Sequence, residues 1–490
     1  MYVNNVEKII VPITDKFLIK LGFLLNLVLI CPLLYFYPES ITTKIFLFLL
    51  FLFTVCCFLL ELRISFYFFL FSLFIAPVIL NFCPGVSGFI IRELPLILIL
   101  FLIIIKFLGT ATSRIHGVRL SQFEIILLMF FFMMLIQALR QYPIVIGILG
   151  FRSVALYMPI YFMVLVLFNS KEKIQKLVTF LIGIALFLAL IAIFQYIFTQ
   201  SLMNILGFKL GDVAYRTSMG HLKASATLGS PFTFAMIIAT NFLILLSLYI
   251  SRNLKTNQIV TIISLFILGL ALIFSFSRII FLSFILVFFL LGFFYKRKII
   301  KYFVIVLLFL VIINVMLDNF LIENLLSSFG IGKNNLGISS TMERVEFIKK
   351  GLALVSEKPL FGFGLGVTGA PSRHYADLLE KGYFVTENYY LKLLIESGIV
   401  GTTLFVLFFG IAILNGLKLY KKINDGYLKH LSIALTLGLI IIAIINVATS
   451  SLELPAFNCF FWLILGLLNA CYFADYKINK TTEISFLTKN

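Results

Sequence analysis

Apolar runs of about 20 residues follow one another along almost the whole chain, and no other feature constrains the fold so strongly. A helix of that length crosses the hydrocarbon core of a bilayer. A soluble core could not bury this much apolar surface, because 62% of the 490 residues are hydrophobic and only 12% are charged. The sequence therefore predicts an all-α polytopic integral membrane protein with about fourteen transmembrane helices, at residues 17–37, 44–60, 64–81, 94–108, 124–139, 153–168, 177–198, 232–250, 259–276, 279–295, 302–317, 399–417, 431–449 and 456–473.

Lysine and arginine in the short connections predict the orientation of these spans. They gather in alternate connections, and an even number of spans places both chain termini on that same side. Because basic residues of short loops stay in the cytoplasm, we predict that both termini are cytoplasmic. The same bias explains the net charge of +18, so nucleic acid is not an expected partner.

Two long connections are predicted on the opposite, outer side. They divide the chain into an eleven-span region at 1–317 with an outer loop at 199–231, a large outer loop at 318–398, and the last three spans with a cytoplasmic tail at 399–490. The one long stretch of mixed polarity in the chain, residues 339–401, lies mostly within the large outer loop. We expect the spans to hold this stretch in place.

The large outer loop contains a predicted amphipathic helix at 341–357. Residues 340–343, Ser-Thr-Met-Glu, have the spacing of a capping box. The apolar residues that follow fall on one stripe, which we expect to lie on an apolar surface: Val345, Ile348, Leu352 and Val355. A loop with glycine at every second position follows at 362–366, and its backbone could approach a ligand closely.

Arginine is concentrated on the outer side, where the charge bias predicts few basic residues. A guanidinium suits phosphate oxygens better than an ammonium does, so this distribution favours a site for an anionic head group. The outer arginines are Arg92, Arg140, Arg152, Arg216, Arg278, Arg344 and Arg373.

Four cations are the candidates for holding such an anion. Arg278 lies in a tight turn between two spans, where an arginine indicates function unless its side chain reaches lipid head groups. The same two interpretations apply to Arg152, which the predicted span places at an outer mouth. Arg216 and Lys223 precede a stretch of small residues at 224–231, where a helix start could approach an anion.

Two side chains could accept a proton. Glu387 stands beside Asn388 at the edge of an apolar run, and a desolvated carboxylate there could take a proton from a sugar hydroxyl. The alternative is an acid that only stabilises a helix N-terminus. His374 lies in the outer loop, where a histidine is usually solvated. No Asp-x-Asp, P-loop, HExxH or GxSxG motif is present, so we expect neither a metal nor a cofactor.

The order of four motifs resembles the O-antigen ligase and polymerase superfamily. They are KASATLGSPFTFA at 223–235, SFSRIIFLSF at 275–284, a segment at 344–366 that ends in PLFGFGLG, and NYYLKLLIESGIVG at 388–401. The resemblance implies a metal-independent glycosyltransferase at the outer face of a bacterial inner membrane. It would move a glycan from undecaprenyl diphosphate to an acceptor hydroxyl.

The resemblance also implies roles for the candidate residues. Arg278 and Arg152, with Lys223 or Arg216, would hold the diphosphate. Many members have His-Asn where this chain has Glu387 and Asn388, and their histidine is the expected base. Here Glu387 would substitute for it, or His374 would take over. The remaining candidates would position the substrate: Arg344, Arg373, Asn388 and Tyr389.

Within the superfamily, the number of spans favours a polymerase of O-antigen or capsular polysaccharide. Its partners would be the undecaprenyl-diphosphate-linked oligosaccharide, membrane lipid and a chain-length regulator. One alternative is a ligase that joins the glycan to lipid A core or to protein. Another is a flippase for the same lipid-linked sugar, which should show related halves and cations near the midplane.

Overall fold

The structure is a computed structural model that describes residues 62–82, 93, 95–97, 99–100, 121–208, 217–218, 221–253, 257–295, 336–369 and 386–487. Within these residues the chain is almost entirely helical. Eight of the described helical segments are long and apolar enough to cross a membrane. The spans predicted at 17–37, 44–60 and 302–317 lie outside the described residues, as does most of 94–108.

Most predicted spans that fall in the described residues overlap one helix each, and most ends agree to within two residues. The helix at 177–198 begins six residues earlier, the helix at 431–449 begins five residues earlier, and the helix at 456–473 ends 14 residues later. Eight helices share this overlap. These are α4 (Leu62–Phe82), α6 (Gln122–Arg140), α9 (Lys171–Ile197), α11 (Pro231–Ile250), α12 (Gln258–Phe274), α13 (Arg278–Tyr295), α19 (Gly426–Ala448) and α20 (Pro455–Leu487). Of these, α12 and α13 are shorter apolar helices than the others. Short elements lie between the helices: α10 (Thr199–Ile205), the antiparallel strands β1 (Thr217–Ser218) and β2 (His221–Leu222), and the 3-10 turns η2 (Ala226–Leu228) and η5 (Ser451–Glu453).

Contacts divide the chain into two units. The first consists of Met1–Leu120, Met203–Lys209 and Thr227–Gly229. Within it, the Thr227 hydroxyl donates to the carbonyl of Phe74 in α4 at 2.8 Å. The second consists of Ser121–Leu202, Leu210–Ala226 and Ser230–Asn490, and it holds all the other helices named here, apart from the end of α10.

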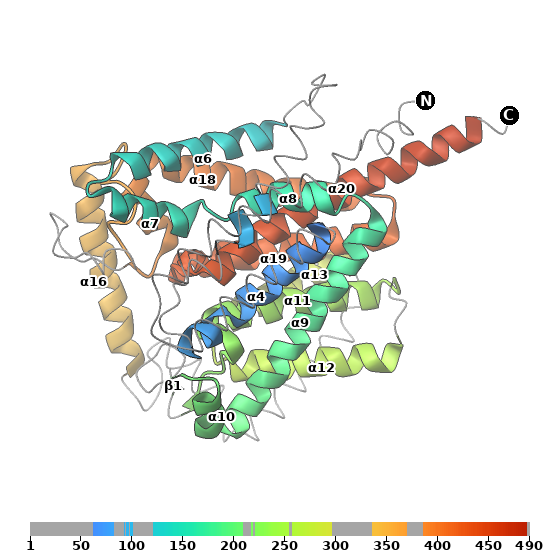
Figure 1. Cartoon of the computed structure of the whole chain (residues 1–490), viewed down its shortest axis with the longest axis horizontal. Coiled ribbons are helices and arrows are strands. Elements are labelled where there is room, and N and C mark those ends of the chain that lie inside the picture. The colour runs from blue at the N-terminus through green and yellow to red at the C-terminus, as the bar shows by residue number, and fades with distance from the viewer. Residues whose placement is uncertain are drawn as a thin grey trace, which may run out of the picture. The chain divides into compact units, whose positions relative to one another are not determined.

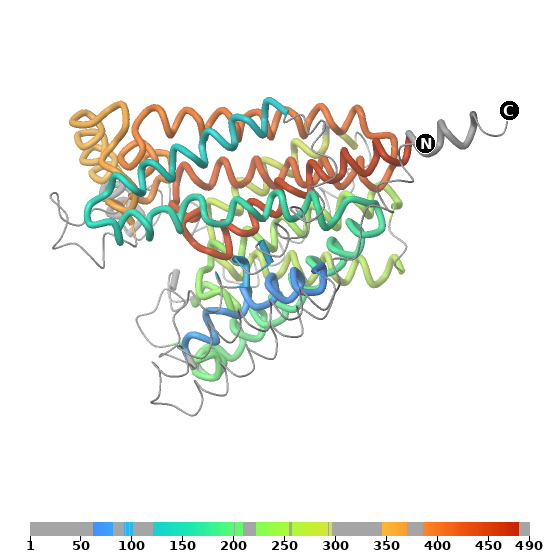
Figure 2. The backbone as a smooth tube through the Cα atoms, turned by 45° about the horizontal axis from the view of Figure 1, so that its top comes forward, coloured from blue at the N-terminus to red at the C-terminus, as the bar shows by residue number. Residues whose placement is uncertain are grey.

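The core of the second unit lies along α11, α19 and α20. Within α11, 94% of the span is buried, against 33% for α6 at the periphery. Helix α18 (Tyr389–Lys422) packs on α19, and α19 packs on α20. Helices α18, α19 and α20 run side by side in Figures 1 and 2.

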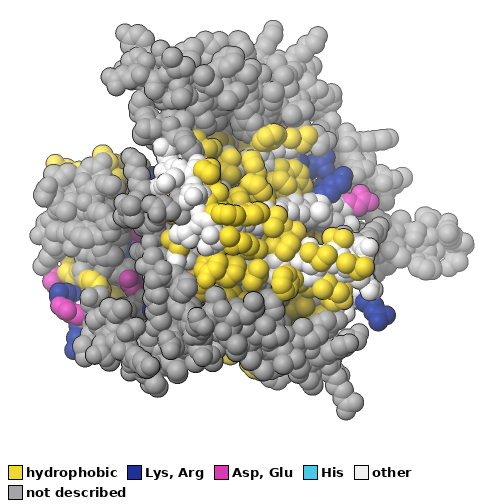
Figure 3. Space-filling model, turned by 90° about the horizontal axis from the view of Figure 1, so that it is seen from below, with side chains coloured by type: hydrophobic (Ala, Val, Ile, Leu, Met, Phe, Trp, Pro, Cys, Tyr) yellow, Lys and Arg dark blue, Asp and Glu magenta, His cyan; other side chains and the backbone are white. Residues whose placement is uncertain are grey.

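The peripheral helices expose apolar side chains, as a surface in contact with lipid requires. Along α6, the exposed residues are Ile125, Met129, Phe132, Ile136 and Leu139. Figure 3 shows hydrophobic side chains covering a broad area of one face of the molecule.

The span predicted at 153–168 has a different start in the structure. The helical segment begins at Ile144 as α7 (Ile144–Val154), turns before Pro159, and continues as α8 (Pro159–Leu167). Hydropathy placed the boundary too late because Arg152 interrupts the apolar run. Arg152 is therefore inside a candidate span and not at its mouth, about 12 Å along the helix from Ile144 at 1.5 Å per residue.

The span predicted to begin at residue 399 also begins earlier. Helix α18 starts at Tyr389, ten residues before the predicted boundary. Lys392 and Glu396 lower the hydropathy of this segment, which made it look like part of the outer loop. Both side chains are completely buried and paired with each other.

The predicted amphipathic helix is present as α16 (Leu336–Glu357), but it starts five residues before residue 341. Residues 340–343 therefore lie inside the helix, so the predicted capping box does not form its N-terminus. The stripe is exposed in the described structure: Val345 by 46% and Leu352 by 52%. Helix α16 instead contacts α18 through Gly351, which lies against Leu391, and it runs crosswise to α18 in Figure 1.

Candidate functional site

Helix α18 contains a break that brings two of the sequence motifs together. Gly398 has a φ of 64° and a ψ of −167°, which is not helical. In a continuous helix, the next two N–H groups would bond to carbonyls one turn earlier. Here Ile399 donates to the carbonyl of Pro359 at 2.8 Å and Val400 to that of Leu360 at 3.3 Å. The chain after α16 thus supplies the acceptors that the helix lacks.

The break leaves backbone carbonyls of α18 without a helical hydrogen-bond partner. These carbonyls accept hydrogen bonds from the glycine loop, residues 362–369. Phe363 N–H donates to the carbonyl of Ile395 and Gly364 N–H to that of Glu396, both at 2.9 Å. The loop therefore fills the break and satisfies buried backbone groups on both sides of it. The motifs PLFGFGLG and IESGIVG form one structural unit, although about 30 residues separate them in sequence.

The glycines allow this loop to approach neighbouring helices. A Cβ atom on Gly398 would lie 2.3 Å from the Leu360 carbonyl oxygen. One on Gly366, where φ is 84°, would lie 2.3 Å from the Ile146 carbonyl oxygen in α7. The N–H groups of residues 363, 364, 366 and 368 all donate to α18. These four backbone groups therefore bind the protein itself and not a ligand, contrary to the sequence-based expectation.

Helix α6 holds the same loop from another side. The Gln137 side-chain amide donates to the Phe361 carbonyl at 2.8 Å, and the Arg140 guanidinium donates to the Gly362 carbonyl at 2.6 Å. Arg140 is one of the arginines that the sequence placed on the outer side, and here it has a structural partner.

A buried ionic cluster lies one turn into α18. The Lys392 ammonium is 3.0 Å from Glu396 Oε1, and both side chains have no exposed surface. The same oxygen accepts from Gly366 N–H at 3.1 Å, from Thr368 N–H at 3.1 Å and from the Thr368 hydroxyl at 2.9 Å. Lys392 also donates to the Thr368 carbonyl at 3.3 Å and lies 3.4 Å from Glu453 Oε1 in η5.

Sequence reasoning missed this cluster. A lone buried charge is costly, and the pair is tolerated because each partner compensates the other and further hydrogen bonds are made. The signal in the sequence was a lysine and a glutamate four residues apart on an otherwise apolar helix, the spacing at which side chains meet.

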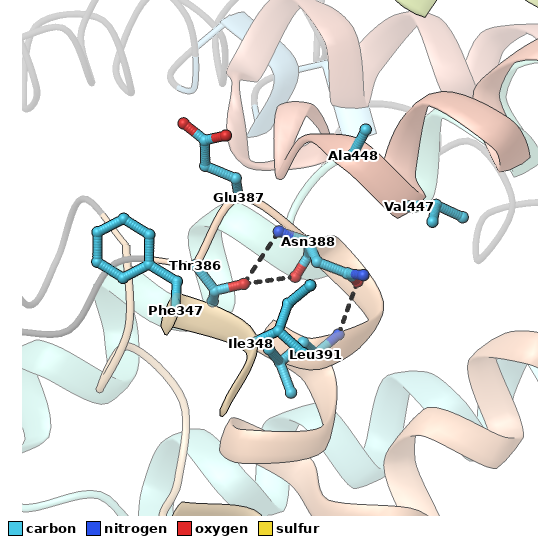
Figure 4. A pocket seen from close by; sticks show the side chains of 8 residues that line it. All are labelled: Phe347, Ile348, Thr386, Glu387, Asn388, Leu391, Val447 and Ala448. Carbon is cyan, nitrogen blue, oxygen red and sulfur yellow. Dashed lines mark hydrogen bonds between the residues drawn. The ribbon is translucent and has the colours of Figure 1, made fainter. Parts of the chain in front are cut away.

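The start of α18 forms the edge of a pocket beside this cluster. Asn388 caps the helix, because its side-chain oxygen accepts from Leu391 N–H at 3.0 Å. The Thr386 hydroxyl donates to the Asn388 carbonyl and accepts from its N–H (Figure 4). Glu387 is exposed, and its carboxylate extends away from the Asn388 side chain in Figure 4.

The pocket is mainly apolar apart from this edge. Its lining residues come from α16, the start of α18 and the end of α19: Phe347, Ile348, Thr386, Glu387, Asn388, Leu391, Val447 and Ala448. The cavity has a volume of about 40 Å³, which is room for a water molecule or two and less than a sugar ring needs.

Lys223 and Arg278 lie on neighbouring stretches of backbone. Ala224 N–H donates to the carbonyl of Phe274, at the end of α12, at 2.9 Å. Arg278 begins α13 after a turn in which Phe276 has a φ of 43°. The structure thus places two backbone segments about 50 residues apart next to each other, and each carries one of the predicted diphosphate-binding residues.

The small-residue stretch after Lys223 is held by α9. The Gln195 side-chain oxygen accepts from Ser225 N–H at 3.0 Å and from Ala226 N–H at 2.9 Å. These two backbone groups are therefore occupied by the protein and are not available to an anion.

The other predicted site residues have different surroundings. Tyr389 is 1% exposed, and its ring packs 5.4 Å from that of Phe405, so it could act on a substrate only through its neighbours. Arg152 lies in α7, partly buried. Arg344 belongs to α16, but the structure does not describe its side chain. Three further candidates lie entirely outside the described residues: Arg216, Arg373 and His374.

Much of this site falls within one family match. Residues 263–406 match the O-antigen ligase family. The match contains Arg278, α16, the glycine loop and both members of the Lys392–Glu396 pair, and it confirms the resemblance to the O-antigen ligase and polymerase superfamily. Members of the O-antigen ligase family are membrane glycosyltransferase-like enzymes. No curated protein matches the chain.

Proposed function

We propose that the protein is a polysaccharide polymerase. It transfers a glycan from undecaprenyl diphosphate to a hydroxyl of a lipid-linked repeat unit at the outer face of a bacterial inner membrane. The match to the O-antigen ligase family, which spans both Arg278 and the Glu387–Asn388 pair, carries the glycosyltransferase part of this proposal, and the choice of a polymerase rests on the predicted number of spans. The backbone bond from Ala224 to Phe274 supports the proposal, because it places the segments that carry Lys223 and Arg278 next to each other, and two cations suit a diphosphate.

In the proposed reaction, the acceptor hydroxyl attacks the anomeric carbon as the bond to the diphosphate breaks. Negative charge grows on the leaving diphosphate, so Arg278 and Lys223, assisted by Arg152 or Arg216, stabilise the transition state more than the bound substrate. Glu387 accepts the proton of the hydroxyl, with His374 as the alternative base. A direct displacement inverts the anomeric centre. No metal is required, because cationic side chains take up the charge of the leaving group.

A complementation experiment tests the proposal. Cells that lack the gene receive the parent protein, Arg278→Ala, Glu387→Gln or the control Lys422→Ala, which removes a charge from the other end of α18. We expect the two site variants to lose the long polysaccharide ladder and the control to keep it. Losing one cation should slow the reaction by about a hundredfold or more, by analogy with a lost oxyanion donor. Full-length ladders in both site variants, with normal amounts of protein in the membrane, would refute the assignment.

A ligase is the second candidate, because the matching family is described by that activity. Deleting the gene separates the alternatives. Loss of a polymerase leaves single repeat units on the acceptor. Loss of a ligase leaves none, and polymer accumulates on the carrier lipid. Loss of a flippase leaves no repeat units at the outer face.

A further inference from the structure

The buried cluster of Lys392, Glu396 and Glu453 has no part in the proposed reaction, although it lies beside the pocket. Lys392 N–H donates to the Asn388 carbonyl at 3.0 Å, so the cluster is one helical turn from the cap of α18. Three segments meet at the cluster: α18 itself, the end of the glycine loop at Thr368, and η5 between α19 and α20. The end of α19 lines the same pocket.

We propose that Lys392 and Glu396 are positioning residues that clamp the glycine loop and η5 to the start of α18 and so set the shape of the pocket beside Glu387 and Asn388. The identity of that pocket as the site of glycan transfer rests on the proposed function. The clamp itself is a matter of geometry and does not depend on which reaction the pocket serves.

The contacts of Glu396 indicate that its side chain positions the glycine loop because it is long enough for the carboxylate to reach the end of that loop. Its Oε1 atom collects four donors, of which three come from Gly366 and Thr368 in the loop and one from Lys392. Its Oε2 atom is buried and has no hydrogen-bond partner. All the hydrogen bonds of the carboxylate are therefore directed to one point, where the loop ends. Aspartate keeps the charge but is one methylene shorter, whereas glutamine keeps the reach without the charge.

Lys392 provides the charge balance and a second tie. It contacts Glu396 and Glu453 and donates to the Thr368 carbonyl. Replacing Lys392 alone would leave the Glu396 charge buried without its cation. Replacing Lys392 by methionine together with Glu396 by glutamine removes both charges of this completely buried pair and keeps both shapes, which often preserves folding, and the partly exposed Glu453 is then the one charged member of the cluster.

Cysteine labelling tests the clamp in the full-length protein. Val447 lines the pocket and is 58% exposed, so Val447→Cys in a background without other cysteines reports access to the pocket. Permeabilised membranes are treated with a charged maleimide, and Lys422→Cys at the far end of α18 serves as the control position. The compared variants are Glu396→Asp, the double Lys392→Met/Glu396→Gln, and Thr368→Val.

We expect Glu396→Asp to raise the labelling rate at position 447 by about threefold or more, because the loop is no longer held. The kcat of polymer formation should fall by about tenfold or more, and KM should change less. The reason is that a loop that is no longer held misaligns the bound substrate more than it weakens substrate binding. The double variant should stay close to the parent in labelling and be more active than Glu396→Asp. Position 422 should label equally in all variants.

Two results would overturn the clamp. One is a Glu396→Asp protein that labels like the parent. The other is a double variant that is less active than Glu396→Asp, since the charge would then matter more than the reach. If Glu396→Asp does not accumulate in the membrane, Thr368→Val decides, because it removes only the hydroxyl and should raise labelling by a smaller factor. A parent protein that makes no polymer while these labelling differences persist would refute the proposed function and leave the clamp intact.

Discussion

At the scale of single residues, Gly398 determines where α18 breaks. Its φ of 64° and ψ of −167° lie in a region that essentially only glycine occupies, and a residue with a side chain there costs about 1–3 kcal/mol. A Cβ atom would also overlap the Leu360 carbonyl, which accepts a hydrogen bond from the helix. Both penalties apply in the folded state only.

We therefore predict that Gly398→Ala lowers the thermal stability of the purified protein in detergent. Gly410→Ala is the matched control in the same helix, because a Cβ at Gly410 meets no atom within 4 Å. The midpoint of heat-induced aggregation should fall clearly for the first variant and stay unchanged or rise for the second. Equal midpoints would show that the break does not require glycine.

Two Lys–Glu pairs of the same spacing allow a second comparison of residues. Lys350 and Glu346 in α16 are 2.7 Å apart and mostly exposed, whereas Lys392 and Glu396 are completely buried. Breaking a buried pair leaves an uncompensated charge, at a cost of about 3–5 kcal/mol, while exposed pairs contribute little. Lys392→Met should therefore reduce the thermal midpoint strongly and Lys350→Met barely. A loss of the same size in both variants would contradict this.

The exposed pair has a pH dependence of known sign. The hydrogen bond from Lys350 lowers the pKa of Glu346 below its ordinary value. The stabilisation is thus complete above the pKa of the unfolded chain and is lost as the pH falls through the lower, folded value. The thermal midpoint of the parent should be slightly higher than that of Glu346→Gln at neutral pH. This difference in midpoint should shrink in acid and in high salt.

At the scale of elements, the connection between α18 and α19 is held by carboxylates. Asp475 in α20 accepts from Asn424 N–H at 3.2 Å and from Asp425 N–H at 2.9 Å. Asp425 in turn caps α19 through Leu428 N–H and pairs with Lys171 of α9. The connection is thereby fixed to two other helices.

We predict that Asp475→Asn destabilises the protein, because an amide has one oxygen where the carboxylate uses two. Each lost hydrogen bond to a charged group is worth about 1.5–3 kcal/mol. Asn479→Ala is the control, since Asn479 donates to the same carboxylate but leaves both backbone bonds in place. The temperature of half-maximal aggregation should fall more for Asp475→Asn. A larger fall for Asn479→Ala would show that the Asp475 carboxylate does not hold the connection between α18 and α19.

The sequence predicted these elements unevenly. Long apolar helices such as α6 and α11 were placed to within a few residues, because hydropathy alone defines them. The starts of α7 and α18 were wrong, because Arg152, Lys392 and Glu396 looked like loop residues. The start of α16 was wrong because a capping-box spacing also occurs inside helices.

The site was less predictable than the helices. The family motifs identified Arg278, Lys223, Glu387 and Asn388 as candidates, but not how they are supported. The bonds between the glycine loop and α18 join residues about 30 apart, and no local pattern encodes such pairing. The glycines at 362–366 were assigned to ligand approach, whereas Gly366 lies against the backbone of α7, and the role of Gly398 in the break of α18 was not predicted.

At the scale of the whole molecule, the orientation in the membrane remains a prediction. Phe361 lies beside the break in α18 at Gly398, Lys422 is the last residue of α18, and both are exposed. If α18 crosses the membrane once with the glycine loop outside, Phe361→Cys should react with an impermeant maleimide in intact cells. Lys422→Cys should react only after permeabilisation. Labelling of position 361 from the cytosol alone would refute both the orientation and the proposed function.

The closure of the break in α18 has a consequence for variation among related proteins. The hydrogen bonds that join residues 363–364 to 395–396 bring both ends of the intervening stretch to one place. Once the ends of a segment are joined, doubling its length costs only about 0.6 kcal/mol in chain entropy. The bonds at residues 363–364 and 395–396 should therefore persist where related proteins differ in the number of residues between the glycine loop and α18. Enzymes that handle different glycans could diverge in this stretch while the scaffold around it stays the same.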